Sequence, residues 1–181
     1  MDLPEHYRGF YRFNTYFALV MLVVGGVAGL VYVELAKPLD FDKAPPGVHL
    51  ETIYRLAILH GHCFLVGAVV PMVWVLILQV GRWLDCRPVG AGALRWSLWT
   101  YIPGAVSILG LLGYKGWHYT NRVLAYGPDA DFNLIHRELF GGSRMWSGVC
   151  HGIGHTIATI GLIIFTVAVI RSLRTRERRG A

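Results

Sequence analysis

The chain has 181 residues, of which 54% are hydrophobic and 15% are charged, and its formal net charge is +6. Soluble domains carry about 25% charged residues, so this composition excludes an ordinary soluble protein. The positive charge does not indicate nucleic-acid binding, because much of it directly follows an apolar segment, where arginines mark a cytoplasmic flank that favours anionic lipid. Five arginines form this C-terminal tail: Arg171, Arg174, Arg176, Arg178 and Arg179.

Four apolar stretches are long enough to cross a bilayer, which takes roughly 20 mostly apolar residues per helix. In chain order they cover residues 15–35, 56–80, 98–119 and 146–170. Little chain remains for a separate soluble domain. The sequence therefore predicts one all-α domain over residues 1–181, an integral membrane four-helix bundle.

The first span is expected to be retained in the mature protein. Arg8 and Arg12 precede it, as in a signal peptide. However, its apolar stretch exceeds the 7–15 residues typical of a signal, and no A-x-A cleavage site follows. Gly25 and Gly29 give this helix a small-xxx-small face, which is suited to close helix packing.

The later spans carry two further signals. Pro71 lies inside the second span, where it predicts a kink. Gly148 and Gly152 give the fourth span a second small-xxx-small pair.

The connections between the spans are expected at residues 36–55, 81–97 and 120–145, the last being the longest. Ten lysines and arginines lie in the two termini and the 81–97 connection, against seven on the opposite side. Basic residues are enriched on the cytoplasmic side of membranes. Both termini are therefore predicted to be cytoplasmic.

Ionisable residues are costly within a membrane, so they mark candidate functional positions. Seven fall in the half of the bundle opposite the termini, which is the outer half in this orientation. They are Glu34, His60, His62, Lys115, His118, His151 and His155. All four helices contribute to this one level, and this convergence is the strongest functional signal in the sequence.

Helical spacing sorts the histidines. His151 and His155 are four residues apart and share one helix face. His60 and His62 are two residues apart, or about 200° around a helix, so they cannot address one central point. One is expected to face the core, and the other a second cofactor, a neighbouring helix or a partner.

Neutral imidazole is a common ligand of haem iron, copper and zinc. Two histidines on facing helices could hold a haem within the bundle, with Lys115 and Arg144 pairing with its propionates. The haem-ligand candidates are His60, His62, His151 and His155. The alternative is a copper or zinc site, for which the candidate ligands are the same histidines together with His118 and Glu34.

Structural interpretations of the same residues stay open. A membrane histidine is often only an interhelical hydrogen-bond donor, and this interpretation is favoured for His118, beside Trp117 and Tyr119. Glu34 and Lys115 could form an ion pair that locks two helices together.

Short motifs in all four spans resemble the DUF2871 family of small bacterial four-helix membrane proteins, over roughly Phe13 to Val169. These motifs are Gly29-Leu30-Val31-Tyr32-Val33-Glu34, His60-Gly61-His62, Lys115-Gly116 and Gly152-Ile153-Gly154-His155. Where the family has Tyr-Arg-Glu on its first helix and Arg-Gly on its third, this chain has Val33 and Lys115 in place of the arginines. The resemblance implies the fold and a multi-pass protein of the bacterial inner membrane. It implies no activity, because the family is uncharacterised.

The His60-Gly61-His62 segment is also similar to the His-x-His of haem–copper oxidases and nitric oxide reductases, where the two histidines serve two haems. The favoured hypothesis is a protein that binds haem b for electron transfer or for sensing a diatomic gas. The alternatives are a copper- or zinc-binding accessory or assembly subunit of a respiratory oxidase, and a cofactor-free structural subunit. The expected partners are the lipid bilayer and respiratory-chain membrane proteins, a homo-oligomer is compatible, and no nucleic acid is expected. Whether the protein is an enzyme stays open.

Overall fold

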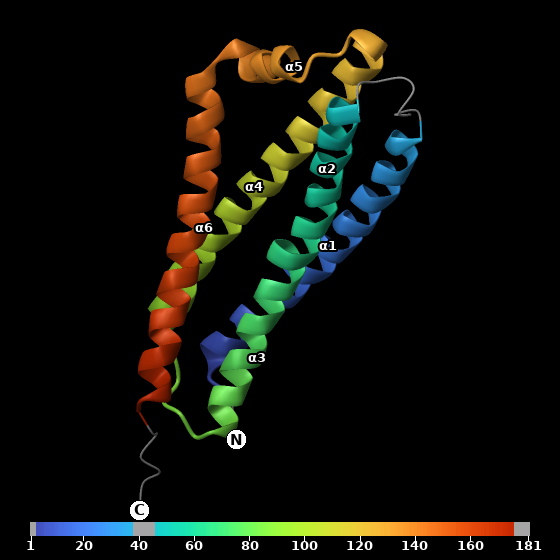
Figure 1. Ribbon diagram of the computed structural model, residues 1–181. Coiled ribbons are helices and arrows are strands. Elements are labelled where there is room, and N and C mark those ends of the chain that lie inside the picture. Colours follow the sequence, from blue (N-terminus) through green and yellow to red (C-terminus); the bar gives the residue numbers. More distant parts are fainter. Residues whose placement is uncertain (1–2, 38–45, 176–181) are drawn as a thin grey trace, which may run out of the picture.

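The computed structural model describes residues 3–37 and 46–175. Figure 1 shows an elongated bundle of long helices: α1 (Glu5–Ala36), α2 (Pro46–His62), α3 (Val70–Trp83), α4 (Ala91–Tyr126) and α6 (Arg144–Leu173). A π-helix, Cys63–Val69, joins α2 to α3, so that these two helices form one long rod. We call the end where α1 begins and α6 ends the terminal end, and the opposite end the distal end.

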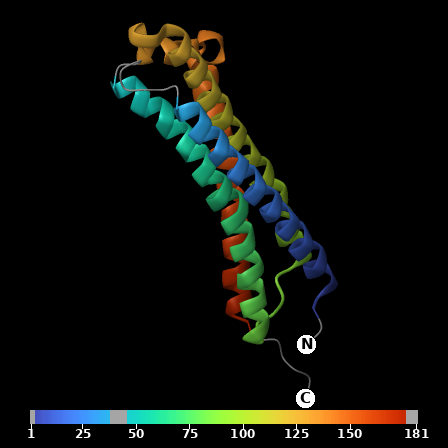
Figure 2. The same ribbon diagram turned by 90° about the vertical axis from the view of Figure 1, so that its right-hand side faces the viewer.

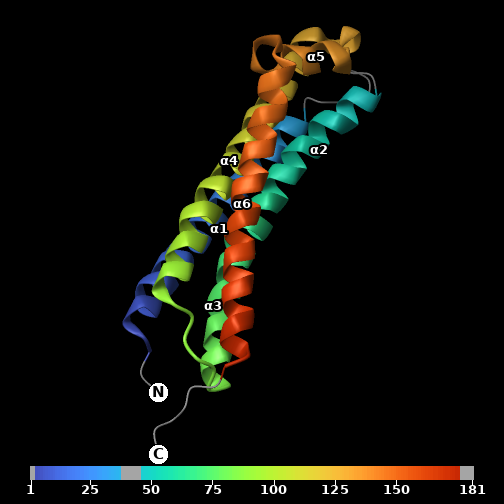
Figure 3. The same ribbon diagram turned by 90° about the vertical axis from the view of Figure 1, so that its left-hand side faces the viewer.

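Shorter elements cover the distal end. A 3-10 turn (Gly127–Asp129) leads from α4 to the short helix α5 (Phe132–Glu138), and a second 3-10 turn (Leu139–Gly142) leads on to α6. In Figure 1 α5 lies across the bundle axis, whereas the long helices run along it in Figures 2 and 3.

Among the residues that the structure describes, four helical segments are long and apolar enough to cross a membrane: Glu5–Ala36, Gly47–Trp83, Ala91–Asp129 and Gly148–Leu173. The predicted all-α fold with four spans is therefore confirmed. Apolar side chains also point away from the bundle, as with Val23 and Leu30 of α1, which are 68% and 70% exposed. A surface of this kind fits contact with lipid.

The predicted connections were too long. The 36–55 segment contains the start of α2, whose first residue is Pro46, and the 81–97 segment contains the start of α4 at Ala91. The 120–145 segment is largely helical, with the last turns of α4 and all of α5. Hydropathy detects only the apolar part of a helix, so it misses polar turns that continue beyond the bilayer.

Near Pro71, where the sequence predicts a kink, the helix changes to the π-helical register, which ends at Val69. The Val70 N–H donates to the carbonyl of Leu65, five residues earlier, in place of Val66. The next donor in this register would be Pro71, which has no N–H. The Val66 carbonyl instead accepts a 2.8 Å hydrogen bond from the hydroxyl of Tyr101 on α4. A side chain thus satisfies the acceptor that the proline leaves open.

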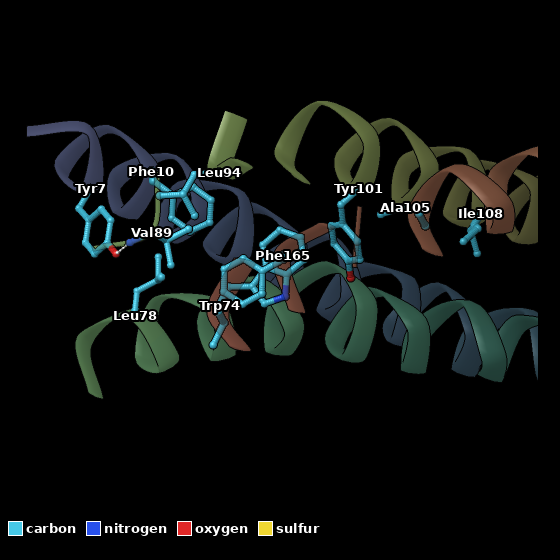
Figure 4. Packing of buried hydrophobic residues seen from close by; sticks show 12 residues of the cluster. Tyr7, Phe10, Trp74, Leu78, Val89, Leu94, Tyr101, Ala105, Ile108 and Phe165 are labelled. Carbon is cyan, nitrogen blue, oxygen red and sulfur yellow. Dashed lines mark hydrogen bonds between the residues drawn. The ribbon is translucent and has the colours of Figure 1, made fainter. Parts of the chain in front are cut away.

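An aromatic core joins four helices in the terminal half of the bundle. The rings of Trp74 (α3) and Phe165 (α6) stack at 4.4 Å between centroids, and Phe10 of α1 stacks on both. Tyr101 of α4 completes the group, 4.9 Å from Trp74 (Figure 4).

Glycines set the closest helix contacts. On α4, a Cβ added to Gly104 would overlap the backbone of Ala158 on α6, and Gly161 of α6 lies equally close to α4. Gly25 and Gly29 of α1 pack against α2 and the π-helix, which confirms the predicted small-xxx-small face. Gly148 and Gly152 have open space beside them, so the second predicted pair does not pack in this way.

The distal half is arranged differently. There α6 packs along α4, α4 packs against α2, and α2 packs against α1 (Figure 1). In the described part of the chain, α2 and α6 are both neighbours of α4 and do not pack extensively on each other. The histidines of α2 and α6 therefore lie on two helices that both pack against α4.

Candidate functional site

His60 of α2 is held against α1. Its Nδ1 lies 2.7 Å from the carbonyl oxygen of Gly25, and its ring occupies the space that a side chain at Gly29 would need. The ring also meets Phe64 edge-on, with 4.5 Å between centroids. Because a carbonyl oxygen only accepts, Nδ1 donates this interhelical hydrogen bond.

His62 is held by its own helix. Its Nδ1 donates to the carbonyl oxygen of Ile58, one turn earlier, at 3.0 Å. Different elements therefore hold His60 and His62, in agreement with the prediction that they do not address one point. His62 is also the last residue of α2, directly before the π-helix, an element that is frequent at functional sites.

His151 and His155 of α6 differ in the same way. His151 Nε2 lies 2.7 Å from the Nζ atom of Lys115 on α4. A charged lysine can only donate, so the imidazole accepts this bond through Nε2. His155 Nδ1 donates to the carbonyl oxygen of His151 at 2.9 Å, and the His155 side chain is exposed.

The contacts along α4 place the two pairs of histidines at a similar level. Leu56 and Leu59 of α2 lie against Gly116 and Gly113 of α4, just before His60 in the chain. Gly154 of α6 lies against Ser107 and Ile108 of α4.

Glu34 does not join this level. Its carboxylate lies 2.5 Å from Lys37 on the same helix, and both side chains are largely exposed. The ion pair between Glu34 and Lys115, which the sequence left open, does not form, because Lys115 contacts His151 instead. The ionisable groups of this level therefore come from three helices, α2, α4 and α6, because the Glu34 side chain is exposed and pairs with Lys37 of α1.

His118 fastens the distal cover to α4. Its Nε2 donates to the carbonyl oxygen of Ile135 on α5 at 3.2 Å, and the hydroxyl of neighbouring Tyr119 lies 2.7 Å from His136 Nδ1. Within residues 3–37 and 46–175, no three His, Cys, Asp or Glu side chains are placed to hold a metal ion together. The candidate copper or zinc ligands, which were the four histidines of α2 and α6 with His118 and Glu34, are therefore not grouped into a metal site in these ranges.

Arg55 is a site residue that the sequence did not indicate, because it fell within the predicted 36–55 connection. Its guanidinium lies 4.4 Å from the ring centroid of Tyr119 and 5.8 Å from that of Phe132, in cation–π contacts. The side chain is 20% exposed and pairs with Glu51 of its own helix at 3.4 Å. The available signal was an arginine among apolar neighbours, Ile53 and Leu56.

Positive charge is buried at this site. Lys115 is only 6% exposed, and the charge of Arg55 acts on it electrostatically. The Nε atom of Arg55 is buried and has no hydrogen-bond partner within the described ranges. Buried charges need partners, and the half-exposed Glu51 is the acid paired with this group. The arrangement therefore suits an added anionic group. The side chain of Arg144, the other expected propionate partner, lies outside the described residues.

A family model described as "Protein of unknown function (DUF2871)" matches residues 12–172, nearly the whole helical bundle. This match confirms the family resemblance seen in the four motifs. No curated protein and no solved structure matches the chain, so the similarity of His60-Gly61-His62 to haem–copper oxidases is not confirmed.

Proposed function

Because the chain belongs to the DUF2871 family, whose description assigns no activity, we propose from the geometry of the site that this protein binds b-type haem through His62 and His155 and serves in electron transfer.

One observation carries this proposal. His62 and His155 each donate Nδ1–H to the carbonyl oxygen four residues earlier in their own helix, at 3.0 and 2.9 Å. Each neutral ring then presents an unprotonated Nε2, the atom that can bind iron. A backbone carbonyl that fixes the tautomer in this way is a common support for a metal-binding histidine. The Nε2 atom of His151, by contrast, is already engaged by Lys115.

The surroundings of the two ligands fit a flat, anionic group. A Cβ added to Gly61 or Gly152 would meet no atom within 4 Å, so there is room beside each candidate ligand. Lys115 lies against His151. His151 and His155 are one helical turn, or about 6 Å, apart along α6. Lys115 and Arg55 are the cations that would pair with the propionates, as the sequence suggested for Lys115.

A haem with two imidazole ligands supplies a one-electron couple and leaves no open position on its iron. Electron transfer therefore fits this ligand pair better than gas sensing, which requires a ligand to be displaced. The protein's own contribution is to fix both neutral imidazoles through backbone carbonyls of their own helices.

The test is a difference spectrum between the air-oxidised and dithionite-reduced forms of the detergent-purified protein, expressed with ample haem supply. We expect a sharp reduced α-band and a shifted Soret band. His62→Ala and His155→Ala should each lose most of the bound haem, because iron retains one strong protein ligand at most.

The matched control is His118→Ala, whose ring reaches Ile135 on α5 and not the proposed ligands. This variant should keep the haem content of the wild type. Helical content by circular dichroism separates lost ligation from lost folding. A colourless wild-type protein, or full haem in both ligand variants, would contradict the proposal.

A cofactor-free structural subunit is the second candidate. Two of the four histidines already join helices without any cofactor, His60 to Gly25 and His151 to Lys115. On this hypothesis the purified protein is colourless and metal-free. The third option, a copper or zinc accessory subunit of a respiratory oxidase, would require the ligands to regroup, and elemental analysis of the same sample tests it.

The expected cellular setting is part of the proposal. The multi-pass helices fit a bacterial inner membrane with both termini in the cytoplasm, and respiratory-chain membrane proteins are the natural electron-transfer partners there.

A further inference from the structure

A groove of about 350 Å³ lies between α1 and α4 in the terminal half of the bundle. Figure 3 shows these two helices side by side toward the terminal end. The lining residues are Phe13, Arg95, Leu98, Trp99, Ile102 and Pro103. The volume is within the range of small-molecule sites, roughly 300–1,000 Å³.

The groove is charged at one end, at Arg95, and apolar along the rest of its length. Arg95 stands one turn after the start of α4 at Ala91, and Leu98 and Ile102 follow along the same helix toward its middle. Trp99 is 71% exposed and Phe13 is 46% exposed, so the groove opens on the outer surface of the bundle. In a membrane protein that surface faces lipid.

Pro103 adds a polar feature within the apolar part. A proline inside a helix cannot donate the N–H that the carbonyl four residues earlier would accept. That carbonyl belongs to Trp99, which lines the same groove.

We propose that this groove binds an anionic phospholipid, with the phosphate at Arg95 and one acyl chain along Leu98 and Ile102. Charge complementarity carries the choice of ligand. Arg95 has no acidic partner within the described residues, and among the described residues of the terminal end arginines outnumber the acids, which are Glu5 and Asp85. These arginines are Arg8, Arg12, Arg82, Arg87, Arg95, Arg171 and Arg174. Basic clusters beside a membrane attract anionic lipids, and an arginine pairs with phosphate in a fixed geometry.

This site is separate from the histidine level, so it stands or falls independently of haem binding. The test is the thermal unfolding midpoint, Tm, of the protein in neutral detergent. Phosphatidylglycerol should raise Tm by about 3 °C or more over phosphatidylcholine with the same acyl chains, because a ligand that binds only the folded state stabilises it. Glycerol phosphate, which has no acyl chain, should have no effect.

Arg95→Gln should abolish the preference for phosphatidylglycerol and leave the response to phosphatidylcholine unchanged. Arg174→Gln is the matched control, since it removes the same charge from the same end of the bundle outside the groove. It should retain the wild-type preference.

Four results would overturn the proposal. The first is an equal response of the wild type to both lipids, and the second is an unchanged preference in Arg95→Gln. The third is full stabilisation by glycerol phosphate, which would show a site for soluble anions only. A larger effect from a neutral isoprenoid quinone than from phosphatidylglycerol would also reject the anionic ligand.

Discussion

At the scale of single residues, local hydrogen bonds distinguish histidines that hydropathy treats alike. His60 and His151 bond to other helices, through Gly25 and Lys115. His62 and His155 bond to their own backbone and keep Nε2 for other use. The two-residue spacing of His60 and His62 predicts that their side chains point in different directions. It does not predict which atom of each ring is engaged.

The hydrogen bond of Tyr101 allows the contribution of one side-chain hydrogen bond to stability to be measured. Its hydroxyl donates to the Val66 carbonyl, which lacks a helical donor because of Pro71. Tyr101→Phe should lower the free energy of unfolding by about 1–2 kcal/mol, since a partly buried acceptor then loses its partner. Equilibrium unfolding in mixed micelles measures this change. Tyr16→Phe, at a side chain that is 64% exposed, is the control and should have little effect.

At the scale of elements, contacts between helices depend on where glycine meets a backbone. The α4–α6 pair approaches most closely at Gly104 and Gly161, neither of which forms a small-xxx-small pair with another glycine. Gly148 and Gly152 do form such a pair, but they face open space. A sequence motif shows that close packing is sterically allowed, and the partner surface decides whether it occurs.

Gly104→Ala tests this contact. A Cβ there would overlap the backbone of Ala158, which cannot move as freely as a side chain, so we expect a loss of about 1–3 kcal/mol. The control is Gly110→Ala on the same helix, where nothing lies within 4 Å. Alanine favours helix over glycine by about 1 kcal/mol, so this variant should be neutral or slightly more stable. Equal destabilisation of both variants would show that the helix contact is not responsible.

At the scale of the whole molecule, one loop ties the terminal end together. The Val89 N–H donates to the Tyr7 hydroxyl at 2.7 Å, and His6 Nε2 donates to the Val89 carbonyl at 2.9 Å. On the other side, the Arg87 N–H donates to the Thr175 carbonyl at 2.9 Å. The start of α1 and the end of α6 are thereby held at the same end of the bundle.

This arrangement gives a direct test of orientation. The basic residues of the terminal end predict that it faces the cytoplasm. A C-terminal green fluorescent protein fusion should therefore fluoresce, and a C-terminal alkaline phosphatase fusion should be inactive. An active phosphatase fusion would reverse the orientation and place the histidine level on the cytoplasmic side.

The sequence by itself determined the class of the molecule, its four spans and its family, because long apolar stretches can only be helices in a bilayer. It also identified the histidines, since ionisable residues stand out against an apolar background. It extended the connections too far, because polar helical turns such as those around Arg55 have no hydropathy signal.

Only the tertiary structure decided which side chains meet. Lys115 faces His151 and not Glu34, and Tyr101 reaches from α4 to Val66 of the π-helix. Such contacts depend on the order of helices in space and on their relative rotation. Both are set by packing between distant segments, such as Gly104 on Ala158, which a one-dimensional pattern does not record.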